Sequence, residues 1–201
     1  MVIDGLYYAL GCAAGGLVVA WLAGPVYGIP LFVAALFCLY FFRDPERQIP
    51  SGAVAVSPAD GKVVALEAES PSVARVSIFM NLFDVHVNRS PIAGRIAEVR
   101  YQRGRFLAAN RQQASEQNEQ NMVIVEGEAT RVAFKQIAGI IARRIVFYKK
   151  PGDAVRAGER VGLIKFGSRV DVLLGAEWDI QVRPGNRVLA GSSILARRRS
   201  A

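Results

Sequence analysis

Pro151-Gly152-Asp153-Ala154-Val155-Arg156-Ala157-Gly158 combines a tight turn, a short strand and a second turn, and the pattern returns as Pro184-Gly185-Asn186-Arg187-Val188-Leu189-Ala190-Gly191. A second pair of segments is related by the same offset: Ser57-Pro58 with Gly61-Lys62-Val63, and Ser90-Pro91 with Gly94-Arg95-Ile96. Because Pro, Gly, Asp and Asn are common turn residues, a single match carries little weight. Two matches at one offset predict a duplicated β-hairpin architecture.

The sequence around these turns is typical of a mainly β protein. From Gly52 onward, short runs of β-branched residues are broken by Gly, Pro and Asp, which favours a barrel or a sandwich. The clearest runs are Val63–Leu66, Val76–Phe79, Met122–Val125 and Val161–Ile164. The repeated turns resemble the hammerhead strands of lipoyl-type domains, so we expect a barrel-sandwich fold. The polar residues 103–120 are expected to form a loop or a short helix.

Residues 1–42 differ in composition from the rest of the chain, because they contain no Lys, Arg or Glu and only one Asp, Asp4. Leu6–Ala23 is a long apolar run, and Ile29–Phe42 is a second, shorter one. A membrane span needs about 20 apolar residues, so the first run is near the lower limit. We therefore expect a membrane-anchoring helical hairpin over residues 1–42 and a β-rich domain over 43–201. A cleavable signal peptide fits less well, since no basic segment precedes the first run.

The chain has a formal net charge of +8, and every basic side chain follows residue 42. Basic patches bind nucleic acids, but beside a membrane anchor the favoured partner is an anionic lipid surface. Arg43 and Arg47 follow the hairpin, which predicts that the β-rich domain lies on the cytoplasmic side of the cell membrane. The Arg197–Arg199 tail would either add to lipid attraction or be solvated. Cys12 and Cys38 lie inside the apolar runs and predict neither a disulfide nor a metal pair.

Three segments contain residues with catalytic potential. The only histidine, His86, lies in Asp84–Asn88, Ser168 follows a glycine, and Asp60 ends the stretch Ser57–Asp60. A serine nucleophile needs a neighbouring base that a third group orients. Taken singly, each residue has a structural explanation: a buried histidine, a turn serine and an aspartate that caps its own turn. A zinc site built on two or three histidines is excluded.

Together these segments resemble the short-form phosphatidylserine decarboxylases, over most of the chain from about residue 40. Five motifs carry the resemblance in this order along the chain: Ser57–Val63, Asp84–Gly94, Asn118–Asn121, Ile137–Arg144 and Phe166–Ser168.

This resemblance implies a self-processing lyase of phospholipid biosynthesis. His86 would take the proton of the Ser168 hydroxyl, which attacks the Gly167 carbonyl, and Asp60 would orient His86. Elimination and hydrolysis would leave a pyruvoyl group at the start of a short α chain, 168–201, paired with a β chain, 1–167. The ketone would form a Schiff base with phosphatidylserine and release CO2, giving phosphatidylethanolamine. No external cofactor or metal is implied.

Several points stay open at this stage. Asn118 and Asn121 would shape either the site or a turn. Long-form members have a second histidine where this chain has Phe83, so the proton donor to the product carbon is unassigned. The arginines near the motifs are all candidates for the lipid phosphate: Arg89, Arg143, Arg144 and Arg169. The alternative functions are a membrane-anchored, lipoyl-like binding or adaptor module and a decarboxylase of a related serine lipid, archaetidylserine. The sequence is also compatible with a homo-oligomer.

Overall fold

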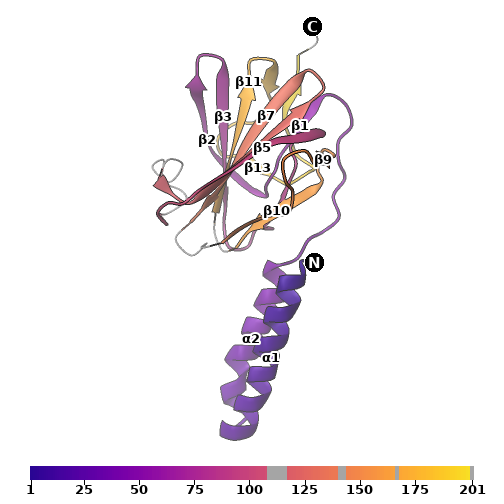
Figure 1. The fold of residues 1–201 in the computed structure, drawn as a ribbon. Helices are drawn as coiled ribbons and strands as arrows, with labels where there is room; N and C mark the ends of the chain where they lie inside the picture. The colour runs from indigo at the N-terminus through magenta and orange to yellow at the C-terminus, as the bar shows by residue number, and fades with distance from the viewer. Residues whose placement is uncertain (108–116, 140–143, 166–167, 200–201) are drawn as a thin grey trace. The chain divides into compact units, whose positions relative to one another are not determined.

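The computed structural model describes residues 1–107, 117–139, 144–165 and 168–199. It divides into two compact units, Met1–Glu46 and Arg47–Ala201. The first unit is the expected helical hairpin, formed by α1 (Ile3–Ala23) and α2 (Pro25–Phe41) (Figure 1). By length and composition alone, α1 is the one helix in the described part of the chain that could cross a membrane.

Two features of the sequence allow the helices of this unit to pair closely. Gly24, with a φ of +106°, reverses the chain, and Pro25 begins α2; proline favours the first helical position, where no backbone N–H is needed. A Cβ atom at Gly28 would lie 2.6 Å from the carbonyl oxygen of Gly16. Glycine at this position therefore lets the two backbones approach.

The second unit is mainly β, as expected. Its strands are β1 (Val54–Val56), β2 (Gly61–Ser70), β3 (Val73–Met80), β4 (Val87–Arg89), β5 (Gly94–Gln102), β6 (Gln120–Gly127), β7 (Thr130–Ala138), β8 (Ile145–Phe147), β9 (Ala154–Val155), β10 (Arg160–Ile164), β11 (Ser168–Gly175), β12 (Trp178–Ile180), β13 (Arg187–Val188) and β14 (Ile194–Arg198). All four runs singled out in the sequence lie within strands. Of residues 103–120, the described part is largely irregular, with one bridge between Arg105 and Asn118.

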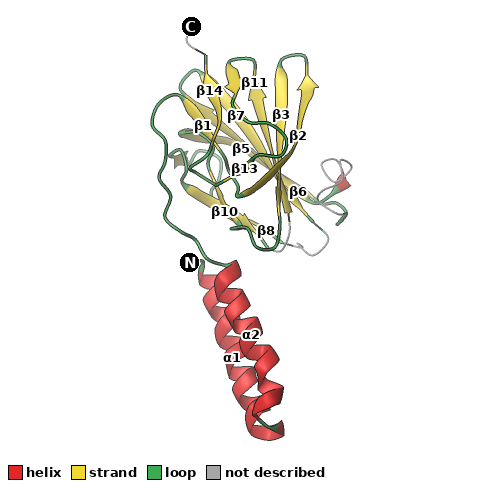
Figure 2. Cartoon of the chain, turned by 180° about the vertical axis from the view of Figure 1, so that it is seen from behind, coloured by secondary structure: helices red, strands yellow, loops and turns green. Residues whose placement is uncertain are grey.

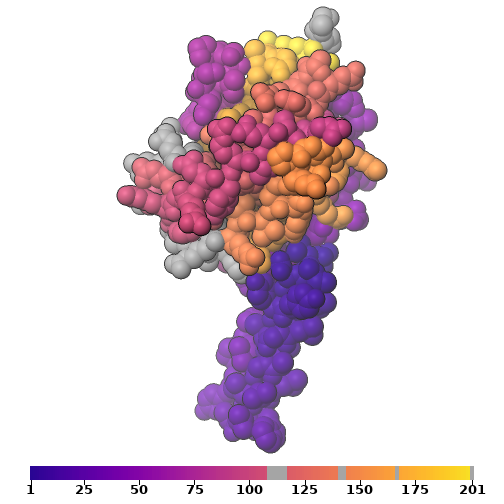
Figure 3. Space-filling view, viewed as in Figure 1, coloured from indigo at the N-terminus to yellow at the C-terminus, as the bar shows by residue number. Residues whose placement is uncertain are grey.

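The strands form one large curled sheet and two small sheets. The eight-stranded antiparallel sheet has the order β13-β2-β3-β11-β7-β6-β5-β9, and its long strands lie side by side in Figure 1. Sheets of order β1-β14-β12 and β4-β10-β8 complete the unit, and β1 and β14 are seen together from behind in Figure 2. Figure 3 shows the middle of the chain, in rose and orange, forming the near surface of this unit. Apolar side chains such as Ile78, Phe134 and Val172 fill its core.

The sequence repeat appears in the structure as a pseudo-twofold arrangement. At one edge of the large sheet β13 pairs with β2, with Val188 opposite Gly61. At the other edge β9 pairs with β5, with Val155 opposite Gly94. The repeat relates Gly61 to Gly94 and Val155 to Val188, so the two edges have equivalent pairs. The duplicated hairpin predicted from the sequence is therefore confirmed.

Backbone geometry in the repeated turns matches as closely as the pairing. Gly152 and Gly185 have φ values of +95° and +99°, and Gly158 and Gly191 have +72° and +77°. Because side chains with a Cβ atom rarely adopt such values, glycine is needed at each of these turns. The N–H of Gly191 donates to the Ser57 carbonyl at 2.8 Å, just as the N–H of Gly158 donates to a serine carbonyl, that of Ser90, at 2.8 Å.

This symmetry predicts that Ser57 and Ser90 make equal contributions to the free energy of unfolding. The Ser57 hydroxyl donates to the Ala59 carbonyl at 2.6 Å, and the Ser90 hydroxyl donates to the Ile92 carbonyl at 2.8 Å; both serines are fully buried. Ser57→Ala and Ser90→Ala should each lower the free energy of unfolding by about 1 kcal/mol. Urea unfolding followed by tryptophan fluorescence measures this.

Ser72→Ala is the control, because Ser72 is exposed, and it should change the free energy of unfolding by less than about 0.5 kcal/mol. A loss confined to one of the two buried serines would contradict their equivalence.

Candidate active site

Ser168 begins β11, the strand that lies between β3 and β7 in the large sheet. It stands opposite Met80 on one side and Ala138 on the other, so hydrogen-bonded strands fix its backbone on both sides. The side chain is fully buried, and its hydroxyl donates to the Met80 sulfur at 3.2 Å. Gly167 and Phe166, the other residues of the expected cleavage segment, lie outside the described residues.

His86 precedes β4 and is also buried, with 1% of its surface exposed. Its Nδ1 atom lies 2.9 Å from the carbonyl oxygen of Asp84. Because a carbonyl can only accept, Nδ1 carries the proton and Nε2 is the basic nitrogen. The backbone carbonyl of His86 accepts a hydrogen bond from Ile164 at 3.2 Å. Ile164 is the last residue of β10, the strand that precedes Ser168 in the sequence. This bond therefore holds His86 beside the end of β10.

The Asp60 carboxylate accepts hydrogen bonds from two residues, one that precedes it in the sequence and one that follows far behind it. Arg47 Nη2 donates to the two carboxylate oxygens at 3.0 and 2.8 Å, and the Ala190 N–H donates to one of them at 2.7 Å. Burial raises the pKa of the Asp60 carboxyl, the Ala190 N–H and the Arg47 guanidinium lower it in part, and the charge of Asp84 raises it. The bonds described for this carboxylate stabilise its ionised form. Its expected role in orienting His86 stays a prediction.

The pseudo-twofold repeat shows that the fold itself does not require an aspartate at this turn. The counterpart of Asp60 in the other copy is position 93, which is an alanine. Both turns form with a buried serine and the same backbone bonds. Since Ala93 suffices in one copy, the carboxylate of Asp60 is a local addition to the fold. The bonds that this carboxylate accepts from Arg47 and Ala190 have no counterpart at Ala93.

A backbone carbonyl brings the Asp60 turn beside the strand that follows His86. The Pro58 carbonyl accepts a hydrogen bond from the Arg89 N–H at 2.9 Å and from Asn88 Nδ2 at 3.4 Å. The same Asn88 Nδ2 lies 4.0 Å from the Met80 sulfur, to which Ser168 donates. Three motifs far apart in the sequence therefore meet around Pro58, Asn88 and Met80.

Asn118 and Asn121, whose role the sequence left open, both lie in this region. Asn118 Nδ2 donates to the Ala138 carbonyl at 2.7 Å and to the Leu107 carbonyl at 2.8 Å. Asn118 thus holds the residue that stands opposite Ser168. Asn121 Nδ2 donates to Gln136 Oε1 at 3.0 Å, which begins a chain of amides toward Asn88.

The candidate arginines for the lipid phosphate have different environments. Arg169 is buried, and it donates to Asp171 Oδ1 at 2.6 Å and to the Ser77 hydroxyl at 2.6 Å. Arg89 is buried and donates to the Gly158 carbonyl at 3.0 Å. Both guanidinium groups therefore bond to other groups of the protein. Arg144 is exposed, and Arg143 lies outside the described residues. Phe83, at the position of the second histidine in long-form members, is 65% exposed.

Three residues of this region have no site role predicted from the sequence: Arg47, Asp84 and Asn88. Arg47 had been assigned to the membrane surface, whereas its side chain is 11% exposed and paired with Asp60. The spacing of Asp84 and Asn88, each at the second position from His86, is a signal that could have found the other two. Alternate residues of an extended chain share one face.

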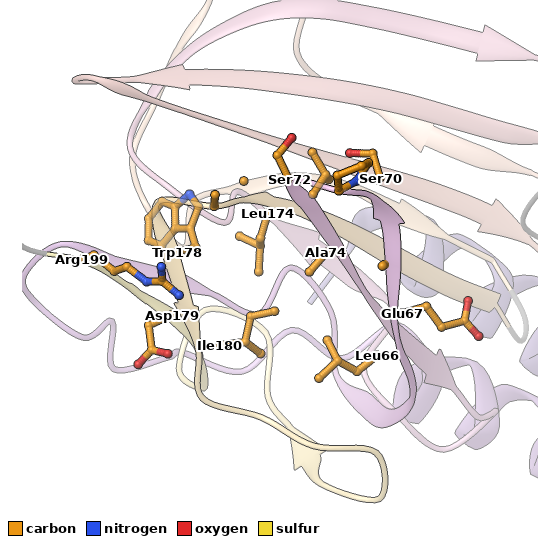
Figure 4. Close-up of a pocket in the computed structure, with 15 residues that line it drawn as sticks. Leu66, Glu67, Ser70, Ser72, Ala74, Leu174, Trp178, Asp179, Ile180 and Arg199 are labelled. Carbon is orange, nitrogen blue, oxygen red and sulfur yellow. The ribbon is translucent and has the colours of Figure 1, made fainter.

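A cavity of about 480 Å³ lies elsewhere in the same unit (Figure 4). Its lining includes Ala74, Leu174 and Trp178, and Figure 4 shows Arg199 and Asp179 at one side of it. Leu174 lies along β11 from Ser168 at a distance that corresponds to roughly 20 Å in a strand. This cavity is therefore separate from the region around Ser168.

Comparison with known proteins gives the family. The family model for phosphatidylserine decarboxylase matches residues 34–196. The chain belongs to the phosphatidylserine decarboxylase family. A phosphatidylserine decarboxylase proenzyme from Solibacter usitatus (strain Ellin6076) is 65% identical over 198 residues, which cover 98% of this chain and 97% of that relative. A second phosphatidylserine decarboxylase proenzyme, from Erythrobacter litoralis (strain HTCC2594), is 45% identical over 214 residues, which cover 96% of this chain and 86% of that relative. As a member of the phosphatidylserine decarboxylase family, this proenzyme is a carboxy-lyase.

The ion pair with Asp60 predicts a functional role for Arg47 in this family member. Arg47→Met removes a cation that lowers the pKa of Asp60, so that pKa should rise further. If ionised Asp60 supports self-cleavage, the acidic limb of the pH profile should move to higher pH. Cleavage during cell-free synthesis, followed on gels across a pH series, measures this shift.

Arg43→Met is the matched control, because Arg43 contacts the Tyr40 ring and carbonyl within the helical unit. Its pH profile should follow that of the wild type. An unshifted profile in Arg47→Met would show that the ion pair does not act through Asp60.

Proposed function

We propose that this chain decarboxylates phosphatidylserine to phosphatidylethanolamine and CO2, using a pyruvoyl group made from its own Ser168. The burial of a serine hydroxyl at the start of β11, in a family whose named members are proenzymes, carries the proposal. Cleavage between Gly167 and Ser168 would give a β chain of residues 1–167 and an α chain of 168–201.

In the cleavage step, His86 Nε2 accepts the proton of the Ser168 hydroxyl as its oxygen attacks the Gly167 carbonyl carbon. The peptide bond breaks, an ester forms, and the proton passes to the released amine. The Asp84 carbonyl supports this role, because it holds the proton on Nδ1. Asp60, whose ionised form Arg47 favours, stabilises the imidazolium that forms.

The pyruvoyl group then arises without an added cofactor. Loss of the Ser168 Cα proton breaks the ester bond and releases the Gly167 carboxylate. The dehydroalanine that remains takes up water and loses ammonia, which leaves a ketone at position 168. This ketone would supply an electrophile for the amine of the substrate and an acceptor for the electron pair left by CO2.

The surroundings of Ser168 fit such a group. Met80 and Ala138 flank the residue, and Ser168 itself has no exposed surface. A thioether accepts a weak hydrogen bond from the serine hydroxyl and is equally suited to contact a methyl group. No group of three or more His, Cys, Asp or Glu side chains that could hold a metal occurs among the described residues.

A membrane location suits this substrate, because its acyl chains stay in the bilayer while its headgroup reaches the protein. The apolar hairpin supports anchoring, and Arg43 after it supports a cytoplasmic position for the β-rich unit. An anionic leaflet would also attract the basic residues that follow.

Intact-mass analysis under denaturing conditions tests the proposed function. The wild-type chain should separate into two, the smaller beginning at position 168 and lighter by one ammonia than a peptide that begins with serine. Ser168→Ala should remain a single chain of 21.8 kDa and lose all decarboxylase activity.

Ser77→Ala is the matched control, because Ser77 is equally buried but bonds Arg169 instead of Met80. It should still be cut into two chains. A wild-type protein that stays uncut when folded in membranes would contradict the proposed function.

A further inference from the structure

Three buried amide side chains form a directed chain of hydrogen bonds that ends near Ser168. Asn121 Nδ2 donates to Gln136 Oε1 at 3.0 Å, and Gln136 Nε2 donates to Asn88 Oδ1 at 2.9 Å. The exposed fractions of the three residues are 2%, 0% and 0%. Asn121 and Gln136 stand directly opposite each other on β6 and β7. The last amide, Asn88, therefore has its orientation set by two others.

The contacts of Asn88 determine which group of each amide donates and which accepts. The groups facing Asn88 Nδ2 are the Pro58 carbonyl at 3.4 Å and the Met80 sulfur at 4.0 Å. Both groups can only accept, so the NH2 of Asn88 must face them. The bond to the Pro58 carbonyl is longer than a typical N–H···O bond, and a thioether is a weak acceptor. The chain thus presents a buried N–H donor whose contacts are weak.

This donor faces the position where the chemistry is proposed. The Met80 sulfur that Asn88 approaches also accepts the Ser168 hydroxyl at 3.2 Å. Asn88 Nδ2 and Ser168 Oγ therefore approach the same sulfur atom. A serine headgroup joined through its amine at position 168 carries its carboxylate on the adjacent carbon. Through their shared neighbour Met80, Asn88 Nδ2 is the candidate donor for that carboxylate.

A neutral donor is well suited to this carboxylate. The carboxylate loses its negative charge as it leaves as CO2, so a cation would stabilise the bound substrate more than the transition state. An amide N–H orients the group with less of this penalty.

We propose that Asn88 Nδ2 binds the carboxylate of the serine headgroup, and that Gln136 and Asn121 are positioning residues that aim it. This inference rests on the proposed function. It assigns the part of the site that distinguishes the substrate from its product, since phosphatidylethanolamine lacks the carboxylate.

The test compares two lipids that differ only in that group. Phosphatidylserine in mixed micelles gives KM from CO2 release, and phosphatidylethanolamine gives an inhibition constant as a competing amine. Asn88→Leu should raise KM for phosphatidylserine by about 10-fold or more, the effect of losing one hydrogen bond to a charged group. The inhibition constant of phosphatidylethanolamine should stay within about twofold, because that lipid has nothing for Asn88 to bind.

Asn88→Asp tests the same idea while it keeps the bond from Gln136. Its protonated acid can donate to the substrate at low pH, whereas its carboxylate repels the substrate at higher pH. KM for phosphatidylserine should therefore rise with pH more steeply than in the wild type. The inhibition constant of phosphatidylethanolamine, relative to the wild type, should not follow this change.

Asn121→Leu tests the positioning role, because Asn121 is at the far end of the chain from Ser168. It removes one of the two amides that aim Asn88, so the ratio of KM for phosphatidylserine to the inhibition constant of phosphatidylethanolamine should rise as in Asn88→Leu, but by a smaller factor. Intact mass reports in each variant whether the two chains form.

The outcomes separate this inference from the proposed function. A wild-type chain that stays uncut would overturn both. Cut Asn88 variants whose two constants change by the same factor, or whose KM for phosphatidylserine stays within about twofold, would overturn the carboxylate assignment alone.

Discussion

The pairing of β11 with β3 on one side and β7 on the other is the constraint on which the rest of this site depends. It places Ser168 between Met80 and Ala138, with its hydroxyl inside the protein. A serine in a loop would have many orientations, whereas one held by two strands has a fixed backbone and little freedom. Such fixation lowers the entropic cost of an intramolecular attack. The buried position also strengthens the effect of the nearby dipoles and charges.

The pseudo-twofold repeat sets the backbone of the two turns, and a position at which the two copies differ carries the charged side chain of Asp60. Equivalent turns at the two edges of the large sheet have equivalent glycines and serines. Within this frame Asp60 replaces the alanine found at position 93, and Arg47 reaches it from the segment before the first strand. Either turn satisfies the fold, so one copy is free to carry a charged pair that the other lacks.

Much of this organisation could be predicted from the sequence, because turn glycines and β-branched runs are local signals. The repeat of Pro151–Gly158 indicated the hairpins, and the absence of basic residues before Arg43 indicated the helices. The partners of Asp60 and His86 could not be predicted in this way. Arg47 follows the hairpin like a membrane-flanking cation. Asn88 lies inside the Asp84–Gly94 motif and Gln136 directly precedes the Ile137–Arg144 motif, but neither motif indicates that these two amides bond to each other. Their contact arises from strand pairing between distant segments.

The central claim is that the residue at position 168 ends as a ketone at the start of a chain. N-terminal sequencing of the small chain, before and after reductive amination with ammonia and cyanoborohydride, tests it most directly. The untreated chain should be blocked, and the treated chain should give alanine followed by Arg169 and Val170. Serine as the first residue of an unblocked chain, or a start at any other position, would contradict the account.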